Sequence, residues 1–148
     1  YGLVNGKVLG INLRTLDEAT NRAVVNYVTG LIREFVSRGF ARFVFIPFGF
    51  GSFVGRFFDD DLIIARELKD RVKNLVIISE ELSPRQVLCL FNYLDHVIAM
   101  RHHAVIFALL ARKPLTVIIY DTKTLELIKN INKSDIEVVD LRGLVKYA

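Results

Sequence analysis

The stretch VIAMRHHAVIFALLARKPLTVIIYDTK places polar and charged side chains directly after two short apolar runs. Arg101, His102 and His103 follow the first run, and Asp121 and Lys123 follow the second. Arg forms paired hydrogen bonds with phosphates and carboxylates, and His exchanges protons near neutral pH. Together, these residue types are suited to binding a small anion and to moving a proton on it.

Arg101 and His103 stand at the start of a predicted helix, where free backbone N–H groups and the helix dipole attract anions. Cations at this position oppose the dipole and cost a few tenths to about 1 kcal/mol each. A bound anion would remove the conflict, so the pattern favours a ligand site. The alternatives are a packed helix histidine for His103 and a solvent-facing or supporting place for His102.

Strands and helices alternate around these residues from one end of the chain to the other. Short runs that are rich in Val and Ile and apolar on both faces are typical of buried parallel strands. The predicted strands span residues 7–13, 42–47, 74–79, 96–100, 115–120 and 136–139. The predicted helices span residues 18–38, 60–71, 84–93, 101–111 and 122–130. This alternation predicts an α/β fold: a Rossmann-like, doubly wound parallel sheet of about six strands in three α/β/α layers.

Several residues mark where the helices begin and end. Gly39 is placed to end the first helix, and Ser83 with Pro84 is a typical N-cap followed by Pro at the first helical position. Asp121 is suited to cap the last predicted helix. The run Asp59–Asp61 is interpreted as a helix start with a solvated face, where the dipole favours negative charge.

Ligands of open parallel α/β sheets bind outside the carboxyl ends of the strands. Asn12 and Arg14 follow the first strand, so we expect them to join Arg101, Tyr120 and Lys123 at one electropositive edge of the sheet. The alternatives are a turn role for Asn12, a salt bridge for Arg14 and a plain surface position for Lys123.

The composition limits the class of protein. The 148 residues suit one domain, and the net charge of +4 comes from scattered basic residues, which does not predict a nucleic-acid partner. The lone Cys89 cannot form an internal disulfide and is expected to be buried. No apolar run approaches the roughly 20 residues of a membrane span. No spacing of acidic or His residues predicts a metal site, and we expect a cytoplasmic protein.

The stretch FGFGSFVG, residues 48–55, is the one glycine-rich segment. It matches neither the phosphate-binding loop with its terminal Lys-Ser/Thr nor the dinucleotide fingerprint, which should follow the first strand. Its glycines either approach a ligand or shape a turn around buried Phe side chains.

Several of these segments resemble the polysaccharide pyruvyl transferase family. Members carry Arg-x-His-Ala after an apolar strand and then a Pro-containing strand that ends in Tyr-Asp-x-Lys. The corresponding segments here are Met100-Arg-His-His-Ala104, Pro114–Lys123, Asn12-Leu-Arg14, and Phe45-Ile-Pro47 with the downstream Asp60. The Ser-Pro helix start before the Arg-His strand is also similar.

The resemblance implies a two-domain, GT-B-like enzyme in which residues 1–148 form the C-terminal Rossmann-like domain. The chain starts with Tyr rather than Met, so we expect that it is part of a longer protein and lacks an N-terminal half needed in cis. The implied reaction transfers a pyruvyl group from phosphoenolpyruvate to a sugar hydroxyl of a cell-surface polysaccharide or its precursor, forming a ketal. It needs no cofactor and no metal, and a lipid-linked acceptor would bring the protein to a membrane only peripherally.

Under this hypothesis, His103 is the acid or base and Arg101 binds the phosphate. The predicted substrate contacts are Asn12, Arg14, Tyr120, Asp121 and Lys123. Two alternatives remain open: a GT-B glycosyltransferase that uses a nucleotide-sugar donor, and a non-catalytic domain that binds an anionic sugar or a partner. The oligomeric state is not predicted.

Overall fold

The computed structural model describes residues 6–50, 60–131 and 135–146. Six strands form one sheet, and each neighbouring pair is parallel. The strands are β1 (Lys7–Asn12), β2 (Phe40–Phe45), β3 (Leu75–Ile77), β4 (His96–Ala99), β5 (Leu115–Ile119) and β6 (Ile136–Asp140). Their order across the sheet is β3-β2-β1-β4-β5-β6. The order therefore reverses direction between β1 and β4, which is a topological switch point.

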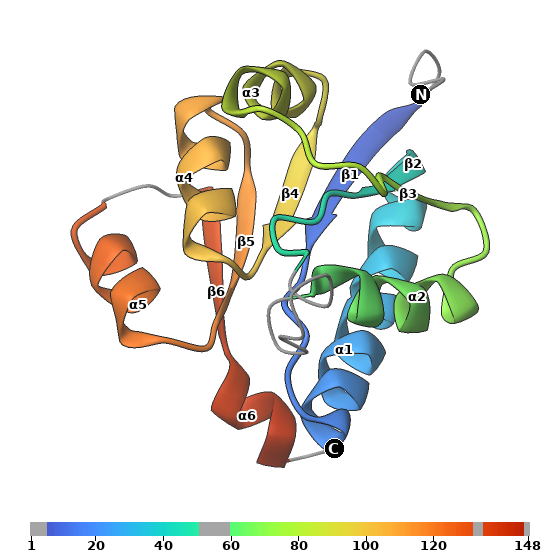
Figure 1. Cartoon of the computed structure of the whole chain (residues 1–148), viewed down its shortest axis with the longest axis vertical. Coiled ribbons are helices and arrows are strands. Elements are labelled where there is room, and N and C mark those ends of the chain that lie inside the picture. Colours follow the sequence, from blue (N-terminus) through green and yellow to red (C-terminus); the bar gives the residue numbers. More distant parts are fainter. Residues whose placement is uncertain (1–5, 51–59, 132–134, 147–148) are drawn as a thin grey trace.

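Helices cover both faces of this sheet (Figure 1). They are α1 (Glu18–Ser37), α2 (Asp61–Arg71), α3 (Pro84–Asn92), α4 (His102–Leu110), α5 (Thr122–Lys129) and α6 (Leu141–Lys146). The core on one face includes residues of α1, α2 and α6, and the core on the other includes residues of α3, α4 and α5. The predicted Rossmann-like, three-layer α/β/α fold is confirmed.

Alternation along β1 divides its side chains between the two cores. Leu9 and Ile11 pack with α1 and α2, whereas Val8 packs on the opposite side with α3 and α4. β1, β4 and β5 are buried almost throughout, as expected of strands covered on both faces. The outermost strands β3 and β6 are more open, and their residues Val76 and Val138 are 39% and 48% exposed.

Local signals set the helix boundaries as predicted. Asp17 caps α1 by accepting a hydrogen bond from the Thr20 amide, and Gly39 follows the end of α1 with a φ of +94° that favours glycine. Ser83 and Gln86 form a reciprocal capping box at the start of α3.

Two features of the helices differ from the sequence expectations. Cys89 is exposed rather than buried, because α3 turns Val87, Leu90 and Phe91 towards the core and leaves Cys89 on its outer side. The helix α6 was not expected, since its six residues contain Gly143 and lack a marked apolar stripe. It packs against α1 and so returns the end of the described chain to the first helix layer.

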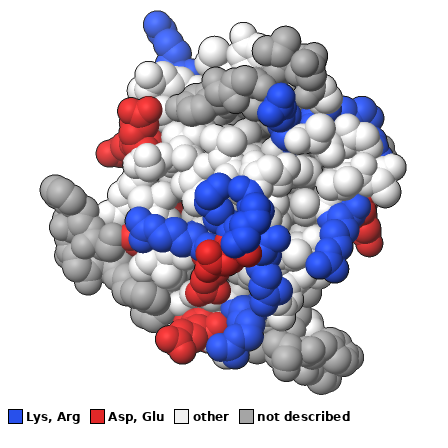
Figure 2. All heavy atoms as spheres, turned by 90° about the vertical axis from the view of Figure 1, so that its right-hand side faces the viewer, with Lys and Arg blue, Asp and Glu red and all other residues white. Residues whose placement is uncertain are grey.

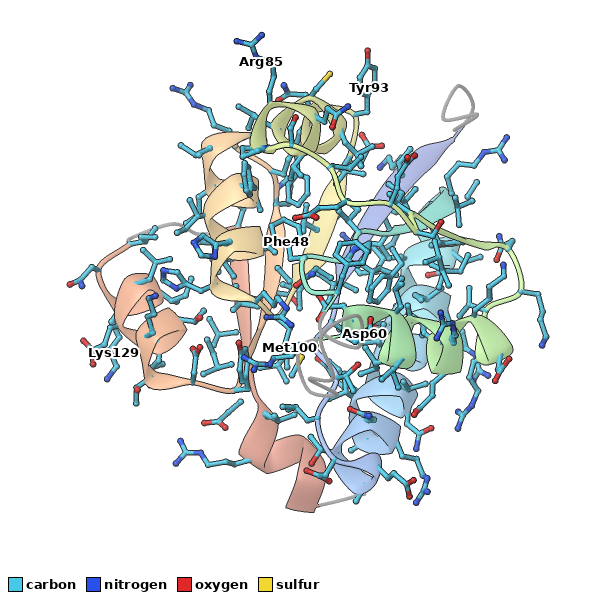
Figure 3. All side chains as sticks on the ribbon, viewed as in Figure 1. Phe48, Asp60, Arg85, Tyr93, Met100 and Lys129 are labelled. Carbon is cyan, nitrogen blue, oxygen red and sulfur yellow. The ribbon has the colours of Figure 1, made fainter. Side chains whose placement is uncertain are left out.

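The glycine-rich stretch is described only up to Phe50. Phe48 packs against Phe91 and Phe107, with ring centroids 6.3 and 5.7 Å apart, and Figure 3 shows it in the interior near α3 and α4. This contact agrees with the interpretation as a turn around packed Phe side chains. The remaining part of the stretch, residues 51–55, lies outside the described residues.

The surface shows no segregation of charge on the face drawn in Figure 2. Basic and acidic side chains are interspersed there among uncharged residues. Among the helices of the described residues, none is long and apolar enough to cross a membrane.

Candidate functional site

The candidate site lies at the carboxyl end of the sheet, where β1 and β4 run side by side. Asn12 is the last residue of β1 and stands opposite Ala99 of β4. Arg101 follows two residues later, directly before α4. Because the strand order reverses between these two strands, their carboxyl ends border the crevice in which such sheets bind ligands.

Asn12 joins three segments at this point. Its side chain is 1% exposed and donates from Nδ2 to the carbonyl of Ile46, which follows β2, at 3.0 Å. Its Oδ1 accepts from the backbone amide of Arg101 at 3.0 Å. The amide thus fixes the start of α4 against β1, which is a structural role within a strand end rather than the turn role considered from the sequence.

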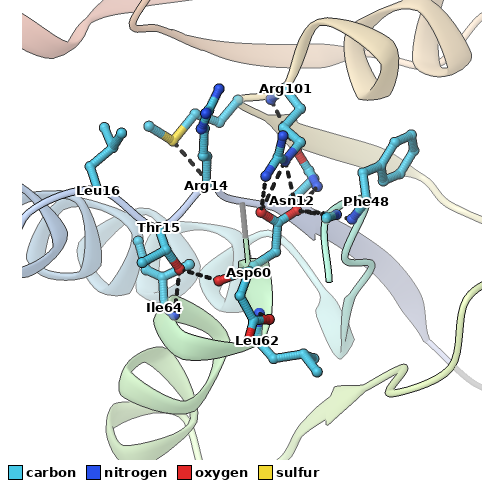
Figure 4. Close-up of polar contacts among 12 residues, drawn as sticks. Asn12, Arg14, Thr15, Leu16, Phe48, Asp60, Leu62, Ile64 and Arg101 are labelled. Carbon is cyan, nitrogen blue, oxygen red and sulfur yellow. Dashed lines mark hydrogen bonds and ion pairs between the residues drawn. The ribbon is translucent and has the colours of Figure 1, made fainter. Parts of the chain in front are cut away.

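Arg101 forms a two-pronged ion pair with Asp61 of α2 (Figure 4). Its Nε lies 2.9 and 3.0 Å from the two carboxylate oxygens, and its Nη2 lies 2.8 Å from Oδ1. Asp61 has no exposed side-chain surface, whereas Arg101 is 17% exposed. The guanidinium is therefore held from the buried side and keeps some access to solvent.

The Asp61 carboxylate also gathers backbone amides from the loop after β2. Its Oδ2 accepts from the amides of Phe48 and Gly49 at 2.9 and 3.1 Å and lies 3.4 Å from Asn12 Nδ2. Burial raises the pKa of Asp61 above its ordinary value, and the contacts with Arg101, Phe48 and Gly49 offset part of this rise. Asp61 is thus a hub that couples the glycine-rich stretch to the start of α4.

The expectation of a solvated Asp59–Asp61 run is wrong for the two residues that the structure describes. Asp60 is 2% exposed, and its side chain caps α2 at the Leu62 amide. The Asp60 carbonyl accepts from the buried hydroxyl of Thr15. Asp60 and Asp61 are buried because one completes the helix cap and the other faces Arg101; Asp59 lies outside the described residues.

The start of α4 is open compared with the other helices. Among α1 to α5 of the described chain, α4 alone has no side-chain hydrogen bond at its cap, where Arg101 stands. His102 is half-buried, with Nδ1 3.4 Å from the Thr124 hydroxyl, and burial followed by the charges of Lys123 and His103 lowers its pKa. His103 is exposed, which excludes the packed-histidine alternative.

Arg14 reaches across the sheet edge to the end of β5. Its Nη1 donates to the Tyr120 hydroxyl at 2.9 Å, and its guanidinium carbon lies 5.3 Å from the Tyr120 ring centre. The backbone amide of Arg14 lies 3.3 Å from the sulfur of Met100, the residue before Arg101. Figure 4 shows the Arg14 and Arg101 side chains next to each other.

A groove of about 980 Å³ opens beside these residues. It is formed by the loop after β1 and the first turn of α1, by the end of β5 with the start of α5, and by the end of β6 with the start of α6. Of the predicted site residues, Arg14, Tyr120 and Asp121 line it. Asp121 also caps α5 by accepting from the Thr124 amide at 2.9 Å, as predicted.

The structure therefore places the predicted residues in two neighbouring groups. Arg101 contacts Asn12 at the switch point, whereas Tyr120 contacts Arg14 at the groove. Lys123 is exposed on the first turn of α5.

The sequence interpretation missed Asp61 as a member of the site. The available signal was the pair of adjacent Asp residues at one helix start: a single carboxylate completes the cap, so the second, Asp61, has another role. Asp140 and Arg142, which form an exposed ion pair at 2.8 Å and line the groove, were also missed.

Among the residues that the structure describes, no three His, Cys, Asp or Glu side chains are grouped so that they could hold a metal ion. The cations of the site are Arg14 and Arg101 with the neighbouring Lys123, and the titratable groups are the two histidines of α4. This set of residues can bind a small anion and transfer protons.

The comparisons with known proteins point to one family. The model of the family described as polysaccharide pyruvyl transferase matches residues 13–122, which is most of the chain. The matched span includes Arg14, Asp61, Arg101 and His103. No curated protein and no solved structure gives a match. The family resemblance inferred from the sequence motifs is confirmed.

Proposed function

The chain belongs to the polysaccharide pyruvyl transferase family, and on this premise we propose that it binds phosphoenolpyruvate and takes part in transferring its pyruvyl group to a saccharide. The acceptor would be a cell-surface polysaccharide or a precursor of one. The observation that carries the proposal is the open start of α4 at the switch point, where Arg101 is anchored by Asp61 and two histidines follow.

The proposed donor site is the start of α4. Arg101 directs Nε and Nη2 to Asp61, and no described residue accepts a hydrogen bond from its Nη1. Nη1 is therefore the edge left for a phosphate or carboxylate oxygen. The uncapped amides of the first turn of α4 add further donors for the same anion. Lys123 stands near enough to His102 to lower its pKa, and it would contribute a further positive charge.

The proposed reaction needs a proton at carbon and a leaving phosphate. The methylene carbon of phosphoenolpyruvate takes up a proton and becomes a methyl group, and positive charge develops on the neighbouring carbon. Two hydroxyls of one sugar add to that carbon, and the bond between it and the phosphate oxygen breaks. One of the two hydroxyl protons balances the proton taken up by the methylene carbon, and the other leaves with the phosphate.

His103 is the candidate for this proton transfer. Imidazole titrates near neutral pH, so it can both give and accept a proton under working conditions. The exposed position of His103 on the first turn of α4 leaves its ring accessible to a ligand held by Arg101. Burial and nearby positive charge favour the neutral form of His102, which makes it the weaker proton donor of the two.

The test is a transfer assay with the full-length polypeptide, phosphoenolpyruvate and a panel of p-nitrophenyl glycosides. Phosphate release and the mass of the ketal product are measured together. His103→Ala should lower kcat by about 100-fold or more, the usual range for loss of a general acid or base. Arg101→Ala should raise the KM for phosphoenolpyruvate. Near wild-type turnover by His103→Ala would refute its role.

A matched control is Arg85→Ala, which removes an exposed arginine at the start of α3, far from the site in Figure 3. This variant should match the wild type in both parameters. The competing nucleotide-sugar hypothesis is tested by thermal shift with phosphoenolpyruvate and with uridine diphosphate. The ligand that binds the folded chain raises its melting temperature by mass action. Stabilisation by the nucleotide alone would favour a glycosyltransferase.

A further inference from the structure

The groove beside the donor site differs from it in chemistry. Its lining includes three aspartates and two arginines, so its formal charge is slightly negative, while the start of α4 carries Arg101 and two histidines. Much of the remaining lining is apolar: Leu16, Ile119, Leu125 and Leu141. A doubly charged donor is better matched to the start of α4, and the groove is better matched to a ligand without net charge.

The charged groups of the groove are largely engaged with one another or with the backbone. Asp140 is paired with Arg142 at 2.8 Å, and Asp17 accepts from both the amide and the hydroxyl of Thr20. Arg14 donates to Tyr120. An incoming phosphate would have to compete with these contacts.

Two polar atoms remain for a neutral ligand. The Tyr120 hydroxyl accepts from Arg14, so its own hydrogen is left to donate, and no described residue accepts it. Asp121 uses Oδ1 to cap α5, and its Oδ2 has no partner among the described residues. A donor and an acceptor next to an aromatic ring and apolar side chains can bind hydroxyls while covering the C–H face of a sugar ring.

We propose that this groove binds the saccharide acceptor, with Tyr120 and Asp121 as the residues that recognise its ring and hydroxyls. The inference rests on the proposed function, because it assigns a place to the acceptor of that reaction. Leu125 of α5 lines the groove, while Thr124 of the same turn lies 3.4 Å from His102. The start of α5 thus borders both sites, so an acceptor in the groove lies next to the donor at α4.

The experiment maps two probes on the amide NMR spectrum of the chain. A panel of p-nitrophenyl glycosides and free monosaccharides should shift the amides of Ile119, Tyr120 and Leu125. Phosphoenolpyruvate should shift the amides of His102 and His103 instead. The inference is overturned if no saccharide of the panel shifts the groove amides at its solubility limit, or if phosphoenolpyruvate shifts them as its main site.

Two variants test the named contacts. Tyr120→Ala should weaken saccharide binding about threefold to tenfold, the range for one aromatic contact. Asp121→Ser keeps a residue that caps helices well but removes the carboxylate, and it should weaken binding about tenfold. Tyr93→Ala is the matched control, because Tyr93 is 65% exposed and projects from the far end of α3 in Figure 3. Unchanged saccharide affinity in both groove variants would contradict the assignment.

The outcome separates this inference from the proposed function. Saccharide shifts in the groove without any effect of phosphoenolpyruvate at α4 would support the groove assignment and remove the donor proposal. Phosphoenolpyruvate shifts at α4 without saccharide shifts would do the reverse. In the transfer assay, Tyr120→Ala should raise the KM for the glycoside acceptor and leave the KM for phosphoenolpyruvate unchanged.

Discussion

Removing the buried carboxylate of Asp61 should destabilise the chain strongly. The change Asp61→Ala leaves the Arg101 guanidinium, which is only 17% exposed, without its counterion, and it leaves the Phe48 and Gly49 amides without their acceptor. Breaking a buried ion pair by removing one partner costs about 3 to 5 kcal/mol. The solvent access of Arg101 relieves part of its charge, and the two orphaned amides add to the cost, so we expect a loss within this range.

The assay is urea unfolding at neutral pH, with the free energy of unfolding extrapolated to water. Asp61→Asn is measured in parallel, because it keeps the volume and part of the hydrogen bonding and should lose less stability. The double variant Asp61→Ala/Arg101→Ala should be less destabilised than the sum of the single variants, with a coupling of about 1 to 3 kcal/mol.

The chain offers a matched control in the pair of Asp140 and Arg142. Its nitrogen–oxygen distance is the same 2.8 Å, but the side chains are 47% and 87% exposed. Asp140→Ala should therefore leave the free energy of unfolding unchanged within error, since solvent screens an exposed pair. If Asp61→Ala costs no more than Asp140→Ala, burial of the ion pair does not contribute as argued here.

Three further predictions concern stability. Burial lowers the pKa of His96 from 6.5 to about 4, so the unfolded chain binds a proton that the folded chain does not. The free energy of unfolding should thus fall by up to roughly 3 kcal/mol as the pH drops through this window, and His96→Gln should remove that component in urea unfolding measured against pH. Gly10→Ala should cost about 1 to 3 kcal/mol in urea unfolding, because its Cβ would lie 2.4 Å from a methyl carbon of the fully buried Leu94. Ser83→Ala should cost about 1 kcal/mol in thermal unfolding through loss of the α3 cap.

Each of these has a matched control. His103→Gln changes an exposed histidine and should leave the pH dependence of stability as in the wild type. Gly30→Ala adds a Cβ with nothing within 4 Å inside α1 and should stabilise the chain by about 0.5 to 1 kcal/mol. Equal effects of Gly10→Ala and Gly30→Ala would contradict the packing argument, and an unchanged melting temperature of Ser83→Ala would contradict the capping argument.

Much of the fold was predictable because its signals are local. Helix caps such as Ser83 and Asp121 act on amides within three residues along the chain, and Gly39 ends α1 through its own backbone conformation. The alternation of apolar runs set the fold class for the same reason. Buried parallel strands and amphipathic helices have different periods that can be read within one segment.

The family and the chemical character of the site were also within reach of the sequence. The Arg101 and His103 motif stood at a predicted strand end, and ligands of such sheets bind there. The edge at which Asn12, Arg14 and Tyr120 gather followed from the parallel direction of all strands.

Only the tertiary structure decided how these residues pair. Asp61 and Arg101 are 40 positions apart, and their contact depends on the order of β1, β2 and β4 in the sheet, which hydrophobic periodicity does not specify. The groove depends in the same way on β6 and α6 returning beside α1. A local pattern determines which element forms, but the partner of a charged side chain is determined by which elements pack together.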